Sequence, residues 1–258
     1  MTIESADSSL VDALHPSENI NERRNGLTPQ LLILHYTGLP SVERSIQVLA
    51  DPRGKVSCHY VIAGDGRITQ MVREDMRAWQ AGVSWWKGET DINSASIGIE
   101  IQNPGHAGGY PPFPNAQMER VRDLSLDICR RNGIAPEGVL AHSDVAPKRK
   151  IDPGEKFDWA WLAAAGVGHW VEPLLPINCG ERLGLGDAGA DVAAMQTALA
   201  AYGYDVPDSG VFDIATQYVV IAFQRHFRPA RVDAMWDASC AETMERLAAR
   251  LGCQAPQS

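Results

Sequence analysis

Residues able to hold a metal ion that activates water occur at separated places in the chain. His142 and Asp152 both lie in the stretch LAHSDVAPKRKIDPGEKFDW, residues 140–159. The Pro153-Gly154 pair after Asp152 predicts a turn, which would hold the carboxylate on a rigid loop. His35 follows the apolar run LLIL and is the third candidate. Two imidazoles and one carboxylate, with a fourth position open, are the ligands of a catalytic Zn²⁺ ion.

Hydrolysis at such an ion also needs a base and a group that stabilises negative charge. Glu100 lies in the alternating run SIGIEIQ, where Gly98 and Glu100 share one face of a predicted strand. Glu100 is therefore the candidate general base. Lys150 is the candidate for stabilising the oxyanion. The structural alternatives are a buried or surface histidine at 35, an outward-facing glutamate at 100 and a solvated lysine at 150.

The elements that must position these side chains alternate between strands and helices. Strands are predicted over residues 31–34, 96–102 and 139–141, with a hairpin around Gly64-Asp65-Gly66. Helices are predicted over residues 41–50 and 115–132, with Ser41 and Asn115 as N-caps and Gly133 as the stop. Residues 79–94, rich in Trp and Gly, indicate a surface loop. This alternation predicts an α/β domain with a mixed central β-sheet flanked by helices.

Composition divides the chain into four parts. Residues 1–27 are polar and predict an extended or partly ordered arm, and residues 28–172 contain the alternating elements. Residues 173–184 contain Pro173, Pro176 and Gly180 and indicate a linker. Residues 185–258 are Ala-rich with helical periodicity, which predicts a small all-α domain of three helices.

Charge and cysteine content limit the partners and the compartment. The 258 residues carry a net charge of −9, which argues against nucleic acid and anionic membrane surfaces as partners. No apolar stretch approaches the roughly 20 residues of a membrane span. The five cysteines form no C-x-x-C pair, so a disulfide framework is not expected. Without a signal peptide in this sequence we expect a cytoplasmic monomer, or a periplasmic one if an export signal was removed.

Four motifs resemble the zinc-dependent N-acetylmuramoyl-L-alanine amidases, whose type-2 amidase fold is shared with peptidoglycan recognition proteins. They are LHYTG, SCHYVIAGDGRI, SIGIEIQNPG and HSDVAPKRKIDPGEKFDW, within residues 28–170. The resemblance implies hydrolysis of the amide between N-acetylmuramic or anhydro-muramic acid and L-alanine, in peptidoglycan turnover or muropeptide recycling. It also implies that His35, His142 and Asp152 bind one Zn²⁺, with Glu100 as the catalytic carboxylate and Lys150 as its partner.

Stem peptides carry carboxylates, which arginine binds bidentately. The candidate substrate contacts are Tyr36, His59, Arg73, Arg77 and Trp79. The alternatives are that His59 packs behind the cleft, that the arginines are solvated and that the tryptophan packs in the core. Many relatives have Trp-His-Ala-Gly where this chain has Trp79-Gln80-Ala81-Gly82, so the pocket contacts near Gln80 are expected to differ.

The C-terminal part resembles the three-helix peptidoglycan-binding domain. The segment LGLGDAGADVAAMQTALAAYGY carries the resemblance, although Asp213 stands where a glycine is usual. The expected core is Val192, Met195, Leu199, Val219 and Phe223. The resemblance implies a domain that presents cell-wall polymer to the amidase or serves as a scaffold. The alternative for the whole chain is a peptidoglycan-recognition protein without catalysis.

Overall fold

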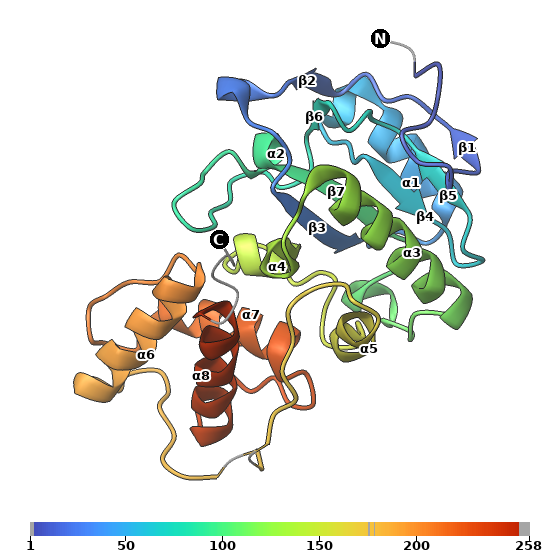
Figure 1. Cartoon of the computed structure of the whole chain (residues 1–258). Helices are drawn as coiled ribbons and strands as arrows, with labels where there is room; N and C mark the ends of the chain where they lie inside the picture. Colours follow the sequence, from blue (N-terminus) through green and yellow to red (C-terminus); the bar gives the residue numbers. More distant parts are fainter. Residues whose placement is uncertain (1–2, 175, 178, 253–258) are drawn as a thin grey trace.

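The computed structural model describes residues 3–174, 176–177 and 179–252, and its centre is a six-stranded sheet (Figure 1). The strand order is β1-β5-β4-β7-β3-β8. The strands are β1 (Ala13–Leu14), β3 (Leu31–Tyr36), β4 (Tyr60–Ile62), β5 (Ile68–Gln70), β7 (Ser96–Ile101) and β8 (Val139–Ala141). The β4–β5 pair is antiparallel and the other neighbours run parallel. The mixed sheet and the hairpin at Gly64-Asp65-Gly66 are confirmed.

The central strands β3 and β7 are apolar because both faces of the sheet are covered. Leu32 and Leu34 of β3 pack with the three isoleucines of β7 and with helix α3 (Asn115–Asn132). Ile33 points to the opposite face and belongs to an apolar cluster that also contains residues of the C-terminal helices. Side chains alternate along a strand, so His35 lies on the same face as Ile33. In β7, Gly98 and Glu100 lie on the face opposite the three isoleucines.

Short helices surround the sheet in this part of the chain. They are α1 (Val42–Ala50), α2 (Ile92–Ala95), α4 (His142–Val145) and α5 (Trp159–Ala164), with 3₁₀ turns at Arg24–Gly26, Pro52–Gly54, His106–Gly108 and Pro136–Gly138. Ser41 caps α1 by accepting a hydrogen bond from the Arg44 amide, as expected. Gly133 ends α3 in the left-handed region, as expected, but Asn115 is the first helical residue and not the cap.

The N-terminal residues are part of this fold and do not form the expected arm. Strand β1 extends the edge of the main sheet by pairing with β5. Strand β2 (Ile20–Glu22) pairs with β6 (Met76–Ala78) in a second, two-stranded sheet. The guanidinium of Arg23 donates to the carbonyls of Glu74 and Ser94. Satisfied backbone pairing therefore holds a polar segment that has few apolar side chains of its own.

The C-terminal part folds into the three predicted helices, α6 (Ala190–Tyr202), α7 (Ile214–Phe227) and α8 (Ala238–Gly252). All five residues expected in its core are buried there. Asp213, the departure from the usual glycine, accepts a hydrogen bond from the Thr216 amide and caps α7. A carboxylate at this position stabilises the helix N-terminus, which explains why the substitution fits.

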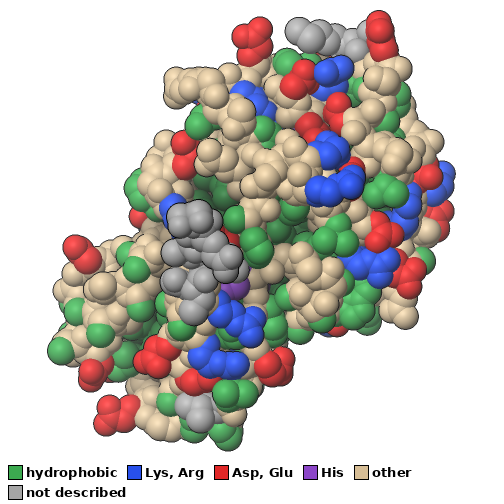
Figure 2. Space-filling view, viewed as in Figure 1, with side chains coloured by type: hydrophobic (Ala, Val, Ile, Leu, Met, Phe, Trp, Pro, Cys, Tyr) green, Lys and Arg blue, Asp and Glu red, His purple; other side chains and the backbone are tan. Residues whose placement is uncertain are grey.

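The two parts share one buried core, and α4 lies between the sheet and helices α6–α8 (Figure 1). Trp86 is 3% exposed and packs edge-to-face on Tyr204, with ring centroids 5.0 Å apart. The prediction of a surface loop over residues 79–94 was therefore wrong at Trp86 and at α2. No described helix is long and apolar enough to span a membrane. On the face shown in Figure 2, acidic and basic side chains are interspersed.

The described cysteines agree with the absence of a disulfide framework. Cys58, Cys129, Cys179 and Cys240 are all unpaired, and Cys58 and Cys240 are buried. Burial raises the pKa of the Cys58 thiol well above its usual range. Cys253 lies outside the described residues.

Candidate metal centre

His35 and Glu100 reach the same face of the sheet from neighbouring strands. They are register partners in the parallel pair β3–β7, near the carboxyl ends of both strands. His142 begins α4 directly after β8, which is the other neighbour of β3. Ligand sites gather at the carboxyl ends of parallel strands because the following loops meet there. The sheet thus brings together residues that are far apart in the sequence.

Three ligand atoms of His35, His142 and Asp152 converge on one point. The two Nδ1 atoms lie 2.8 Å apart, and Asp152 Oδ2 lies 3.1 Å from that of His35 and 3.0 Å from that of His142. All three residues are buried. A tetrahedral ion with bonds of about 2.0–2.1 Å has ligands roughly 3.3–3.4 Å apart, so the two carboxylate separations are a few tenths of an ångström short of that geometry and the Nδ1–Nδ1 separation is about half an ångström short.

A chain of hydrogen bonds fixes the tautomer of His35. The Ser96 hydroxyl donates to the Ile92 carbonyl over 2.5 Å and accepts from Gln80 Nε2 over 2.9 Å. This leaves Gln80 Oε1 as the acceptor, 2.9 Å from His35 Nε2. The proton of His35 is therefore on Nε2, and the Nδ1 lone pair faces the convergence point.

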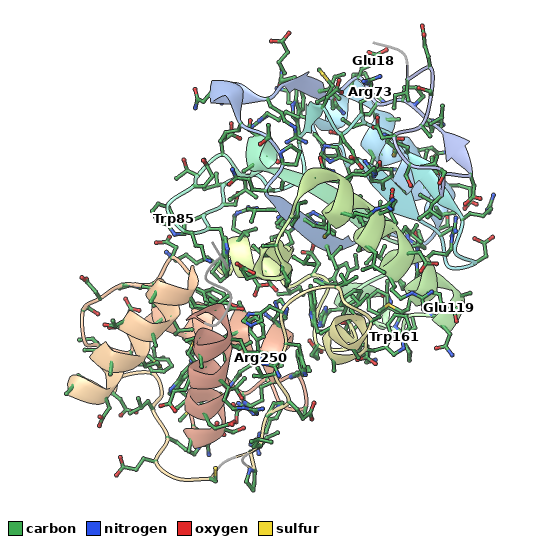
Figure 3. All side chains as sticks on the ribbon, in the orientation of Figure 1. Glu18, Arg73, Trp85, Glu119, Trp161 and Arg250 are labelled. Atoms are coloured by element: carbon green, nitrogen blue, oxygen red, sulfur yellow. The ribbon has the colours of Figure 1, made fainter. Side chains whose placement is uncertain are left out.

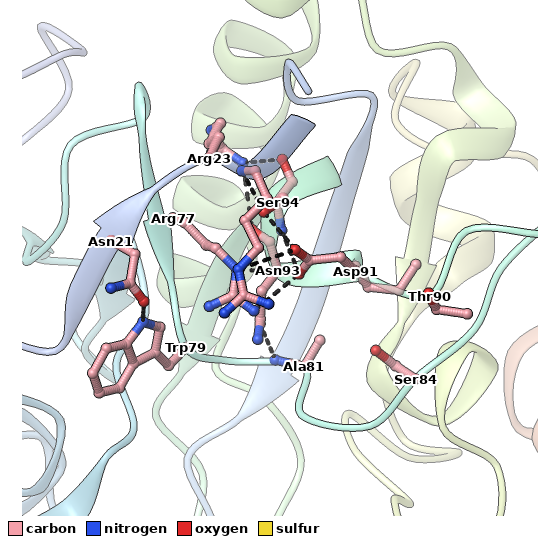
Figure 4. Close-up of polar contacts among 12 residues, drawn as sticks. Asn21, Arg23, Arg77, Trp79, Ala81, Ser84, Thr90, Asp91, Asn93 and Ser94 are labelled. Atoms are coloured by element: carbon pink, nitrogen blue, oxygen red, sulfur yellow. Dashed lines mark hydrogen bonds and ion pairs between the residues drawn. The ribbon is translucent and has the colours of Figure 1, made fainter. Parts of the chain in front are cut away.

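The backbone of Ala81, the residue after Gln80, orients His142 in the same way. Its Nε2 lies 3.2 Å from the Ala81 carbonyl oxygen and donates to it. Asn93 Oδ1 accepts from the amides of both Gln80 and Ala81, over 2.9 and 2.8 Å (Figure 4). Arg149 also donates to the Ala81 carbonyl. Two imidazole lone pairs and a carboxylate oxygen then meet without a donor among them, an arrangement that a cation stabilises.

Burial and the closeness of the three side chains shift the pKa values of these residues. Burial alone would raise the pKa of Asp152, but the adjacent His142 and His35 hold it well below its usual range. Burial lowers the pKa of His142 to about 4. Burial alone would lower the pKa of His35, but the hydrogen bond to Asp152 and the charges of Glu100 and Asp152 raise it. Metal ligands must be an ionised carboxylate and neutral imidazoles, so a cation bound here would compete with protonation of His35.

Glu100 is a buried carboxyl group beside the convergence point. Its Oε2 atom has no hydrogen-bond partner among the described residues. Burial raises the pKa of Glu100 to about 7, against the opposing charges of His35 and Lys150. A carboxyl group with a pKa near neutrality can both accept and return a proton.

A pocket of about 380 Å³ opens onto these groups. Glu100, Lys150 and the three converging residues all line it. Tyr36 lines it as well, and its hydroxyl lies 3.1 Å from His106 Nδ1. The side chains expected to do chemistry, and one of the five expected to contact substrate, therefore share one cavity.

The other expected substrate contacts do not line this pocket. His59 is fully buried, accepts from the Gly98 amide at Nδ1 and donates from Nε2 to the Met76 carbonyl. Of its two expected positions, the structure shows the one behind the cleft. Trp79 donates through Nε1 to Asn21 Oδ1 over 2.6 Å, on the side of β6 that faces β2 (Figure 4).

The two expected arginines are already paired with carboxylates of the chain. Arg77 contacts Asp91, the N-cap of α2, over 2.9 Å (Figure 4). Arg73 pairs with Asp75 over 2.9 Å and lies far from the C-terminal helices (Figure 3). Each arginine has a local partner that competes for its guanidinium, and neither lines the pocket, so their contact with the stem peptide stays a prediction that this geometry does not support.

Sequence reasoning missed the residues that support the ligands. Gln80 was noted only as a departure from relatives, and Asn93, Ser96 and Arg149 were not singled out. Arg149 lines the pocket and adjoins Lys150 in the PKRK run, which was the available signal. Asn93 and Ser96 carry no local signal, since their roles depend on a contact with residues 80 and 81.

Comparison with known proteins agrees with this geometry. The family model described as N-acetylmuramoyl-L-alanine amidase matches residues 25–155. The chain belongs to this amidase family. A second model, of a peptidoglycan binding domain, matches residues 188–244, which contain α6, α7 and the first part of α8.

Similar amidases cover most of the chain. The N-acetylmuramoyl-L-alanine amidase AmiD of Escherichia coli is 38% identical over 242 residues, which are 86% of this chain and 83% of that protein. A structure of AmiD from E. coli, with anhydro-N-acetylmuramic acid-L-Ala-D-γ-Glu-L-Lys, has a TM-score of 0.74 at 35% identity and covers 90% of this chain and 93% of that one. A structure of AmpDh3 from Pseudomonas aeruginosa, with an anhydromuramic pentapeptide, has a TM-score of 0.73 at 31% identity and covers 86% and 92%.

Proposed function

We propose that this amidase uses Zn²⁺ to hydrolyse the bond between N-acetylmuramic or anhydro-muramic acid and the L-alanine of a stem peptide. The single observation that carries the proposal is the convergence of the lone pairs of His35, His142 and Asp152 beside a buried Glu100. The substrate class follows the names of its relatives, which are N-acetylmuramoyl-L-alanine amidases.

The donor set suits zinc. Two imidazole nitrogens and one carboxylate oxygen, with an open fourth position, form a catalytic site of this metal. Zn²⁺ bound here would supply a Lewis acid that polarises the amide carbonyl and lowers the pKa of a water molecule. Gln80 and the Ala81 carbonyl hold both imidazoles in the tautomer that leaves Nδ1 free for the ion.

Glu100 is proposed to move the proton. Its carboxylate takes a proton from the attacking water and then gives it to the nitrogen of the leaving L-alanine. Burial raises the pKa of this group to about 7, so little free energy is lost in either transfer at neutral pH. The unpartnered Oε2 atom leaves one oxygen free to face the water.

Lys150 is proposed to stabilise the oxyanion that forms as water adds to the carbonyl. It lines the same pocket, and its charge lowers the pKa of Glu100. A positive charge in a pocket with little water stabilises developing negative charge more strongly than it would in bulk solvent. Tyr36, on the same wall, is placed to contact the substrate.

Soluble anhydro-muropeptides are the proposed minimal substrates, in recycling of cell-wall fragments. The structures of AmiD and AmpDh3 hold anhydro-muramic peptides, and the pocket of about 380 Å³ suits the end of a glycan with its first peptide residues. The cytoplasmic location and the monomeric state stay predictions.

The test combines metal analysis with hydrolysis of a purified anhydro-muropeptide. We expect one zinc ion per chain, release of a peptide with a free L-alanine amino group, loss of activity on chelation and recovery with Zn²⁺. Comparison with intact sacculi separates soluble from polymeric substrates. A protein that binds the muropeptide but releases no peptide with zinc present would instead be a recognition protein, and the proposed activity would be wrong.

A further inference from the structure

The carboxylate of Asp144 is fully buried, and the C-terminal domain supplies two of its hydrogen-bond donors. The Tyr204 hydroxyl donates to Oδ1 over 2.8 Å. His226 donates from Nδ1 to Oδ2 over 2.6 Å, because a carboxylate can only accept. A buried carboxylate needs hydrogen-bond donors, so the docked C-terminal domain helps to hold Asp144, and with it α4, in this position.

Asp144 in turn fixes the turn that presents His142. Its Oδ2 atom accepts from the Ala141 amide over 2.8 Å, across the junction of β8 and α4. His142 is the first residue of α4, directly after this junction. The next amide, of Ser143, donates to the carbonyl of Asp152 over 3.0 Å. Two of the three candidate ligands are therefore tied to the short helix that Asp144 anchors.

Aromatic residues from both parts of the chain pack against the two donor residues, His226 and Tyr204. The ring of His226 stacks on Trp159 with centroids 3.8 Å apart and on Phe227 at 3.9 Å. Tyr204 packs edge-to-face on Trp86. Both donors thus have little freedom to follow α4 if it moves.

We propose that Tyr204 and His226 are positioning residues of the metal centre, through which the C-terminal domain sets the zinc affinity of His142 and Asp152. The inference rests on the proposed zinc site and deepens it. It gives the C-terminal domain a role in the amidase centre that is separate from any contact with cell-wall polymer.

The test compares two Tyr→Phe variants of the full chain that each remove one buried hydroxyl. Tyr204→Phe loses the bond to Asp144. Tyr202→Phe is the matched control, because its hydroxyl bonds His169 Nδ1 over 2.7 Å in the same interface and does not supply a hydrogen bond to Asp144. Zinc affinity is measured by competition with a chromophoric chelator. Stability is measured by urea unfolding of the protein after a chelator has removed the zinc. Outer-shell substitutions typically lower metal affinity about 10–100-fold, and we expect on the order of tenfold for Tyr204→Phe.

The expected pattern is that both variants lose stability but that zinc affinity falls only in Tyr204→Phe. Equal zinc affinity in the two variants would overturn the inference and leave Tyr204 with a purely structural role. If Tyr204→Phe does not fold, a second pair of variants, at His226, tests the same proposal. His226→Asn keeps a donor near Nδ1 and should retain more zinc affinity than His226→Ala, and no difference between these two would also overturn it. A wild-type chain that binds no zinc would instead contradict the proposed function.

Discussion

The side-chain oxygen of Gln80 accepts a hydrogen bond from His35 Nε2 over 2.9 Å, and its amide nitrogen is held by Ser96. This bond decides which imidazole nitrogen is free for a metal ion. The residue that seemed a departure from the pattern of relatives is thus a support for the first ligand.

Replacing Gln80 with Leu should lower zinc affinity by about 10–100-fold, because His35 loses the acceptor that fixes its tautomer and orientation. The measurement is chelator competition at neutral pH. Gln117→Leu is the control, since Gln117 is also fully buried but bonds the carbonyls of Ile62 and Gln102 away from the ligands. An unchanged affinity in Gln80→Leu would show that the acceptor is dispensable.

Gly98→Ala should have a similar effect by a steric route. A Cβ atom at Gly98 would overlap the side-chain oxygen of Gln80 and push it away from His35. We expect lower zinc affinity and a loss of about 1–3 kcal/mol in unfolding free energy. Gly64→Ala is the control, because no atom lies within 4 Å of a Cβ there and its backbone is not left-handed. Equal zinc affinity in the two alanine variants would argue against the contact with Gln80.

Glu100→Gln should keep zinc and lower kcat by on the order of 10²–10⁴-fold, because the amide cannot take a proton from water. In the wild-type enzyme kcat/KM should rise with pH as Glu100 ionises. Burial raises the pKa of this group to about 7, and a bound cation favours the carboxylate, so the midpoint of the rise should lie between the ordinary value and about 7. If the residual activity of Glu100→Gln keeps this rise, another group is the base.

Glu74→Gln should destabilise the fold by about 1–3 kcal/mol at pH 7. Burial alone would raise the pKa of Glu74, but bonds from Arg131, Tyr60 and Asn132 outweigh it and lower the pKa. A carboxyl group with a lowered pKa stabilises the fold when ionised, so the contribution is present above the pKa of the unfolded chain and is lost as pH falls through the folded value.

The measurement is urea unfolding of the wild type and Glu74→Gln between pH 7 and pH 3. The difference in unfolding free energy should shrink as pH falls. Asp75→Asn is the comparison, because the Arg73–Asp75 pair is largely exposed and should contribute little at any pH. A difference that stays constant with pH would mean that the charge of Glu74 does not stabilise the fold.

The sequence was sufficient to predict the elements and the converging residues where local chemistry is distinctive. Ser41, the hairpin glycines and Gly133 mark element boundaries that the structure shows. The Pro153-Gly154 turn after Asp152 restricts the positions that its carboxylate can take. Strand alternation also placed Gly98 and Glu100 on one face. The register that puts His35 opposite Glu100 could not be read from either strand, because it depends on the pairing of β3 with β7.

The substrate residues were less predictable because partners compete for them. Arg77 and Trp79 flank the motif around Gln80, yet Asp91 and Asn21 hold them away from the pocket. Asn21 lies in a segment that looked like an arm, so its influence on Trp79 had no signal in the sequence. Trp86 likewise appeared to be a loop residue because its partner, Tyr204, is more than a hundred positions away.

The apolar cluster that joins Ile33 and Leu140 to Leu199 and Phe227 restricts how this protein could have been assembled. A C-terminal domain taken from another cell-wall enzyme would need a complementary apolar surface and hydrogen-bond donors for Asp144. Cutting the chain near residue 180 would remove the C-terminal residues of this cluster and expose apolar residues that pack against them. We therefore expect the amidase part and the C-terminal helices to unfold in one transition, and to be inherited together.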